Sequence, residues 1–139
     1  MQGLWAFVKR PIKYINFEDM QGAIKTSNAY IIINTLPVLE QSCLIPGTVL
    51  CDKEENLIND ILSQGLSKKF IIYGKNDADE TVDKKYQQLR GLGFSDIYVY
   101  RGGLFEWLLL QDIYGDTEFP TTSKILDLLK YRGSRTLSL

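Results

Sequence analysis

Continuous runs of apolar residues mark the strands that this chain is expected to form. Residues 30–37 read YIIINTLP and residues 68–74 read KKFIIYG. An apolar run of this length, ended by a proline or a glycine, is typical of a strand covered on both faces, as in a parallel sheet. Shorter runs predict three further strands, at residues 14–17, 48–52 and 96–103.

Helical periodicity fills the intervals between these runs. Residues 17–26, 52–65 and 79–93 each place apolar side chains along one helical face. Residues 104–115, with the sequence LFEWLLLQDIYG, are apolar nearly all round, so this helix must be buried or must meet a partner. Strands that alternate with such helices predict an α/β sandwich, with a mainly parallel five-stranded sheet and helices on both faces.

The end of the chain predicts one more helix, over residues 121–133. Its inward face is formed by three apolar residues, Ile125, Leu128 and Leu129. Three basic residues lie at or beyond its end: Lys130, Arg132 and Arg135. We interpret them as a solvated helix end that complements the helix dipole, with contact to nucleic acid or to an acidic partner as the alternative.

The size and composition fit one folded domain. The chain has 139 residues, of which 45% are hydrophobic and 24% are charged, and this is enough to bury a core without disulfides or metal. We divide it into an N-terminal extension (1–13), an α/β domain (14–118), and a C-terminal helix with a basic tail (119–139).

The net charge and the missing residue types restrict the function. A net charge of −1 argues against a general nucleic-acid binder, which needs a surplus of lysine and arginine. The chain has no histidine, which removes the usual general base, most zinc sites and the histidine-activated nucleophiles. No apolar stretch approaches the roughly 18 residues of a membrane helix, and the first residues do not form a signal peptide. We therefore expect a soluble, intracellular protein without a membrane span.

The two cysteines, Cys43 and Cys51, are separated by a Pro-Gly turn. A disulfide between them is conceivable, but two cysteines in a chain of this size are more typical of buried packing thiols. We interpret them as reduced thiols, with a redox pair as the alternative.

From Tyr14 to Trp107 the order of the segments and their amino-acid sequences resemble a rhodanese-like domain. The most specific piece is LGFSDIYVYRGGLFEW at residues 92–107, which is similar to the phrase that closes most members of that family. The turn LIPGTVL at residues 44–50 is the second piece. The resemblance implies a three-layer rhodanese-like sandwich. The sequence of residues 102–122 is also similar to that of small rhodanese-like proteins of large DNA viruses.

In that family a cysteine directly after the fourth strand carries the transferred sulfur, and the next loop points its backbone N–H groups at it. The matching position here is Gly74, which has no nucleophile. The remaining residues of this loop are Lys75, Asn76, Asp77, Ala78, Asp79 and Glu80. A carboxylate about 4 Å from an anionic sulfur donor costs about 4 kcal/mol at an effective dielectric of about 20. The resemblance therefore implies a degenerate active-site loop with no catalytic residue.

Two further positions depart from the family pattern. The family has Asp-x-Arg after the second strand, where this chain has Asn34, Thr35 and Leu36. The histidine of the family's H-I-P-G-A turn is Leu44 here. Together with Gly74, these differences remove charged and catalytic groups from one end of the sheet and keep the packing residues, as expected when catalysis is no longer required.

The acids of the loop have a simple structural interpretation. Asp77 is expected to cap the following helix, and Glu80 to complete a capping box three residues later. Binding of a divalent cation is the alternative, although the chain lacks the glycine and the distal glutamate of a calcium loop. We expect neither a metal nor a cofactor.

Apolar residues beyond the needs of the fold indicate a protein partner. The candidates for this contact are Leu4, Trp5, Phe7, Trp107, Leu108 and Leu110. Our leading hypothesis is a catalytically inactive rhodanese-like domain that acts as a protein-binding or structural module. Further readings make it a homo-oligomer or a subunit of a large assembly such as a viral particle. The rival hypothesis is a sulfurtransferase for thiosulfate or mercaptopyruvate, or a redox protein, that uses Cys43 or Cys51.

Overall fold

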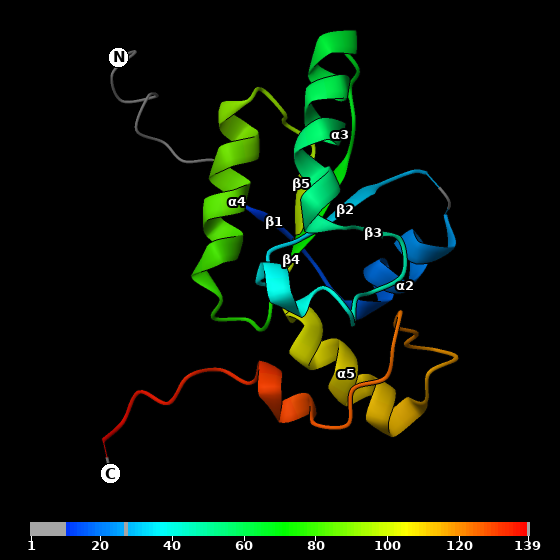
Figure 1. Cartoon of the computed structure of the whole chain (residues 1–139), viewed down its shortest axis with the longest axis vertical. Helices are drawn as coiled ribbons and strands as arrows, with labels where there is room; N and C mark the ends of the chain where they lie inside the picture. The colour runs from blue at the N-terminus through cyan, green and yellow to red at the C-terminus, as the bar shows by residue number, and fades with distance from the viewer. Residues whose placement is uncertain (1–10, 27, 139) are drawn as a thin grey trace.

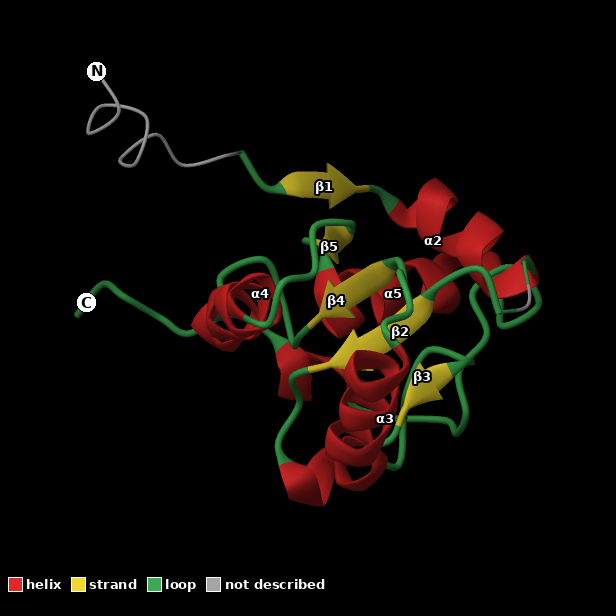
Figure 2. Ribbon diagram, turned by 90° about the horizontal axis from the view of Figure 1, so that it is seen from above, coloured by secondary structure: helices red, strands yellow, loops and turns green. Residues whose placement is uncertain are grey.

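The computed structural model describes residues 11–26 and 28–138. Within them, five strands form one sheet in the order β1-β5-β4-β2-β3, and each neighbouring pair is parallel. The strands are β1 (Lys13–Ile15), β2 (Ile31–Asn34), β3 (Thr48–Val49), β4 (Phe70–Tyr73) and β5 (Ile97–Tyr100). Figure 2 shows them side by side in this order. The predicted five-stranded sheet is therefore confirmed.

In the described part of the chain, four helices cover the sheet, two on each face (Figure 1). The helices α2 (Phe17–Lys25) and α5 (Gly103–Tyr114) pack on one face, and α3 (Cys51–Gln64) and α4 (Glu80–Gly91) pack on the other. There are also two short 3-10 turns, η1 (Val38–Glu40) and η2 (Leu128–Tyr131), and η2 packs against α5. None of these helices is long and apolar enough to cross a membrane.

The two continuous apolar runs form the central strands because both of their faces are covered. Successive side chains of a strand point to opposite faces, so Ile32 and Ile71 pack in the layer of α2 and α5, whereas Ile33 and Ile72 pack in the layer of α3 and α4. All four are at most 3% exposed. Burial of each such side chain contributes about 1.5–3 kcal/mol.

Residues near the C-terminus do not form the predicted helix. Only η2 is helical there, so the prediction of a helix over residues 121–133 is wrong. Polar groups of the Thr-Thr-Ser stretch bond to a distant loop instead: the Thr122 backbone N–H donates to Leu44 O at 2.8 Å, and the Ser123 hydroxyl donates to Ser42 O at 2.8 Å. Such local polar side chains compete with helix formation. The segment is thereby attached to the core.

Aromatic packing places this segment against α5. Trp107 donates its indole N–H to Pro120 O at 2.8 Å, and its ring meets Phe119 edge to face at 5.1 Å. Phe119 and Tyr131 are both buried. The residues after position 118 therefore complete the same hydrophobic core that begins with α2.

Two of the proposed partner contacts are corrected by this packing. Trp107 and Leu108 are 0% and 2% exposed, so they belong to the core and are not available to another chain. Leu110 is partly buried against the same cluster. The other candidates, Leu4, Trp5 and Phe7, lie outside the described residues.

Candidate functional site

The loop between β4 and α4 lies at the carboxyl edge of the parallel sheet. Gly74 follows β4 directly and is buried, and α4 begins at Glu80. In open α/β sheets, ligands bind at the carboxyl ends of the strands. The structure therefore places the predicted degenerate loop where a ligand site is expected in this architecture.

Position 74 has no space for a side chain. A Cβ atom on Gly74 would overlap with Asp79 Oδ2 and would lie 2.7 Å from both Thr35 Oγ1 and Val82 Cγ2. Gly74 does not have a positive φ, so the reason for a glycine here is lack of space and not backbone conformation. A cysteine could not be accommodated at this position without a rearrangement of its neighbours.

The Asp79 carboxylate is bound by the polar groups of its own loop. Its Oδ2 atom accepts a hydrogen bond from the Lys75 backbone N–H at 2.9 Å. Its Oδ1 atom accepts bonds from the Thr81 backbone N–H at 3.1 Å and the Thr81 hydroxyl at 2.6 Å. An internal carboxylate thus uses donors that would otherwise be available to an external anion.

Asp79 is also the N-cap of α4, and this corrects the predicted cap. The carboxylate that accepts from the first turn belongs to Asp79, directly before the helix. Asp77 is exposed, so the predicted pairing of Asp77 with Glu80 is wrong. Asp77 and Asp79 are two residues apart, and the turn of the loop brings only Asp79 to the helix end.

The start of α5 holds the other side of the loop. The backbone N–H groups of Leu104 and Phe105 donate to Gly74 O at 2.9 Å and to Lys75 O at 2.8 Å. Gly103 allows this close approach because a Cβ there would lie 2.8 Å from Gly74 O, and its φ of 67° also favours glycine. Two of the N–H groups that a helix leaves free at its N-terminus are therefore used within the protein.

A neutral hydrogen-bond network lies after β2, at the positions where the rhodanese-like pattern has Asp-x-Arg. Asn34 is 3% exposed, and its side-chain amide forms reciprocal hydrogen bonds with Gln41 at 2.8 and 3.0 Å. Asn34 also donates to Val49 O at 3.3 Å and accepts from the Leu36 N–H at 3.1 Å. Leu44, at the histidine position, is 1% exposed in the apolar core. Sequence reasoning missed Gln41, which has no distinguishing local pattern.

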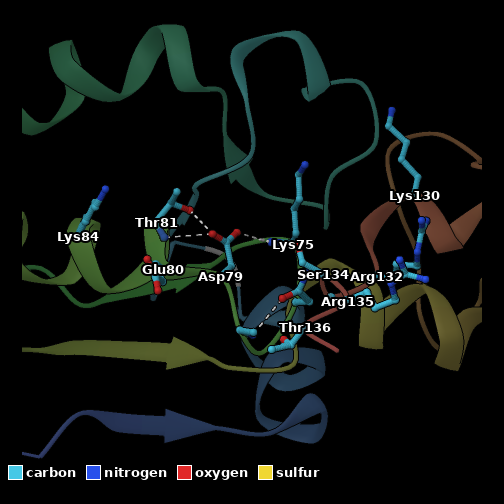
Figure 3. Close-up of a pocket in the computed structure, with 13 residues that line it drawn as sticks. Lys75, Asp79, Glu80, Thr81, Lys84, Lys130, Arg132, Ser134, Arg135 and Thr136 are labelled. Atoms are coloured by element: carbon cyan, nitrogen blue, oxygen red, sulfur yellow. Dashed lines mark hydrogen bonds between the residues drawn. The ribbon is translucent and has the colours of Figure 1, made fainter. Parts of the chain in front are cut away.

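A broad cleft of about 1040 Å³ opens beside the loop (Figure 3). It is lined by the loop, by the first turns of α4, and by Lys130 of η2 and the residues that follow η2. Five of its lining residues are basic: Lys75, Lys84, Lys130, Arg132 and Arg135. Only two are acidic, Asp79 and Glu80. The acids of the loop were expected to repel an anionic donor, but basic residues outnumber them in this cleft, and three of these (Lys130, Arg132 and Arg135) come from a segment that is distant in sequence.

One acidic residue, Glu40 of η1, fixes two of these basic side chains. Its carboxylate lies 3.4 Å from Lys75 Nζ and 3.5 Å from Lys130 Nζ. The Glu40 side chain is only 17% exposed. This shared contact ties the loop, η1 and η2 together at the edge of the cleft.

The cysteines are not placed to act in this cleft. Cys43 is 0% exposed and donates its thiol to Ser123 O at 3.3 Å. Burial raises the pKa of the Cys43 thiol, which disfavours the reactive thiolate. Cys51 is half-buried at the start of α3, and both thiols are free. No cysteine is among the described residues that line the cleft, and no three potential ligands gather to hold a metal ion in the described ranges.

Solved structures with a similar fold include proteins of several organisms. The rhodanese-like domain of an Anabaena protein matches at 20% identity over 94% of this chain and 92% of that domain, with a TM-score of 0.56. A single-domain sulfurtransferase of Saccharomyces cerevisiae matches at 17% identity over 82% of this chain and 100% of that one, with a TM-score of 0.53. A Lactobacillus plantarum protein matches at 17% identity over 70% and 83% of the two chains, with a TM-score of 0.56.

Sequence comparison adds no assignment, since no protein-family model and no curated protein matches the chain. Identities of this size establish an architecture and leave the activity open. The strand order, the two helical layers and the matching structures together show that this chain has the rhodanese-like fold.

Proposed function

We propose that the chain is a rhodanese-like domain without sulfur-transfer activity that serves as a protein-binding module. The observation that carries the first half is the position of Asp79. Its carboxylate fills the space in front of Gly74, where the family's sulfur-bearing side chain would project, and it binds the Lys75 N–H. A sulfur donor would have to displace this anion and would then find no thiol.

The rival sulfurtransferase receives no support from the two cysteines. Cys43 is enclosed by the core and is a hydrogen-bond donor there. Cys51 contributes its backbone N–H to Gln41 at 3.2 Å and does not line the cleft. A persulfide on either residue would form outside the loop that faces the cleft.

The binding half is supported by apolar side chains that the core leaves in solvent. Val38 and Leu39 are adjacent on η1 and are 75% and 96% exposed, and Leu126 is 95% exposed. Side chains of this kind lose their hydration when another protein covers them, and this favours association. We extend the proposal to a subunit of a larger assembly, such as a viral particle, in which these residues are covered.

The test of the catalytic half is transfer of sulfur from thiosulfate or mercaptopyruvate to cyanide. The expected result is no turnover above a buffer blank, and no mass increase of one sulfur atom on Cys43 or Cys51 after incubation with the donor. Turnover or a stable persulfide on either cysteine would overturn this half. Light scattering and co-purification from the native source test the protein-binding half of the proposal. A chain that is monomeric and co-purifies with no other protein would contradict it.

A further inference from the structure

The cleft beside the degenerate loop concentrates positive charge in a chain that is otherwise acidic. Its five basic and two acidic lining residues give a net charge of +3, whereas the net charge of the whole chain is −1. One of the two acids, Asp79, is already bonded to Lys75 N and Thr81 N. The rest of the chain therefore carries a net negative charge.

The basic side chains are arranged as an open row. In Figure 3 the side chains of Lys84, Lys75 and Lys130 point the same way from three different segments, and Arg132 and Arg135 lie beyond Lys75 on the side of η2. Lys84 and Arg132 form no ion pair among the described residues, and both are exposed. Their charges are available to a ligand that spans the loop from α4 to the C-terminal segment.

The shape and lining of the cleft select the kind of ligand. Sites for small molecules are mostly apolar and enclose their ligand within about 300–1,000 Å³. This cleft has about 1040 Å³ and is lined by charged, polar and small residues, with no aromatic side chain among the described ones. The basic lining therefore suits an anionic ligand, and its spread from α4 to the C-terminal segment favours an extended one.

A peptide fits these features better than a nucleic acid. Binding of single strands uses aromatic stacking platforms and a long basic groove, and the described lining offers neither. A nucleic acid that extended beyond the cleft would leave its basic lining for a remainder of the chain whose net charge is negative. A protein segment, unlike a nucleic acid, can confine its negative charges to a length that matches the basic residues of the cleft.

We propose that this cleft binds a carboxylate-rich segment of a protein partner, held along the row of basic side chains that runs from Lys84 through Lys75 to Lys130, Arg132 and Arg135. The inference rests on the proposed function as a binding module and names its partner chemistry. Glu40 opposes the ligand, because it neutralises part of the charge of Lys75 and Lys130. It also holds these two side chains at the edge of the cleft.

The test is fluorescence anisotropy of a labelled decapeptide of glutamate with the full chain, at low salt and at about 0.15 M salt, where surface charges are screened within about 8 Å. The expected result is binding that weakens with salt. The Lys84→Glu/Arg132→Glu variant should weaken it by about tenfold or more at low salt, since each reversal replaces an attraction by a repulsion. Glu40→Gln, which removes the competing carboxylate, should tighten it.

The matched control is Lys53→Glu/Lys68→Glu, which reverses two exposed lysines outside the cleft and changes the net charge equally. At about 0.15 M salt it should leave binding within about twofold, because charges more than about 8 Å from the ligand are then largely screened. The inference is overturned if the glutamate peptide does not bind, if the control pair weakens it as much as the cleft pair, or if a ten-residue oligothymidylate binds at least as tightly. Sulfur transfer is assayed on the same preparation, and turnover there would overturn the proposed function separately.

Discussion

The Asp79 carboxylate packs directly against Gly74, in the space that a side chain at position 74 would need. The same carboxylate caps α4 and bonds to the Lys75 N–H. One acidic residue therefore has three structural roles, and the first of them leaves no space for a side chain at position 74. Each of these roles can be measured as a change in stability.

Replacement of Gly74 by alanine is expected to destabilise the protein by about 1–3 kcal/mol, because the added methyl group overpacks a filled site. Urea unfolding measures this change. Gly22→Ala is the control: Gly22 lies within α2, and a Cβ there meets nothing within 4 Å. It should stabilise the protein by about 0.5–1 kcal/mol, since glycine is unfavourable inside a helix. Equal effects of the two substitutions would contradict the crowding at position 74.

A double-mutant cycle separates Asp79 from the other neighbours of Gly74. The cost of Gly74→Ala should be smaller in an Asp79→Ala background, by about 0.5 kcal/mol or more, since residues in contact are not additive. Some cost should persist, because Thr35 and Val82 still crowd the site. Full additivity would show that Asp79 does not limit the space at position 74.

Gly74→Cys is expected to show no turnover in the sulfur-transfer assay, because its side chain would meet the Asp79 carboxylate.

Replacement of Asn34 by aspartate is expected to destabilise the protein, although it recreates the family's residue at that position. The new carboxylate would lose both donated bonds and would face Gln41 Oε1 and Val49 O. Buried polar groups left without partners cost about 1–3 kcal/mol, and more when charged. Thermal unfolding measures the effect. Asn59→Asp, at an exposed position of α3, should change stability by less than about 0.5 kcal/mol.

The two cysteines are expected to differ in reactivity. Iodoacetamide should label Cys51 before Cys43, because Cys43 is 0% exposed and burial raises the pKa of its thiol. Peptide mapping by mass spectrometry over time gives the two rates. In a Cys51→Ser variant the fast phase should disappear. Equal rates, or faster labelling of Cys43 in the folded protein, would contradict the packing of residues 119–131 over it.

Alkaline pH is expected to destabilise the protein through Tyr100. Burial, with the nearby Glu106 carboxylate, raises the pKa of Tyr100 well above its usual range. In the unfolded chain this phenol titrates near its ordinary pKa of about 10. Above that pH the unfolded state releases a proton that the folded state retains, so stability that is fully present below about pH 10 is lost as the pH rises. The slope is up to about 1.4 kcal/mol per pH unit for one group.

Denaturant unfolding between about pH 9 and pH 11 measures this slope, around the ordinary tyrosine pKa of about 10. Tyr100→Phe should reduce the slope by one tyrosine's share, and it should lower stability at neutral pH because the bond to Glu106 at 2.8 Å is lost. Tyr114, which is 64% exposed, provides the control variant Tyr114→Phe. An unchanged slope in Tyr100→Phe would show that this residue does not carry the effect. Burial also raises the pKa of Tyr73, so some slope should remain.

The sheet and the helices α2 to α5 could be predicted because their signals are local. Continuous apolar runs report two covered faces, as at Ile32 and Ile33, and Gly65 ends α3 in a left-handed conformation with a φ of 64°. The loop after β4 was found by resemblance. The lack of space at Gly74 could not be predicted, since it depends on where Asp79 lies in the folded loop.

Features built from distant segments could not be predicted. The stretch around Thr122 has helical periodicity, but its hydrogen-bond partners lie about 80 residues earlier in the chain. The basic cleft unites Lys75 with Arg135, and no local pattern connects them. Trp107 and Leu108 were predicted to contact a partner, because the sequence does not reveal that residues 119–131 cover α5.

The packing of Asp79 on Gly74 also makes both orders of substitution that would place a thiol at position 74 unfavourable. A cysteine introduced first would collide with the carboxylate, and loss of the carboxylate first would uncap α4 and release Lys75 N. Each single-step intermediate is therefore expected to be less stable than the present protein, and the double variant keeps the lost cap and the crowding by Thr35 and Val82. Both routes from this sequence to a thiol at position 74 are therefore expected to lower stability first.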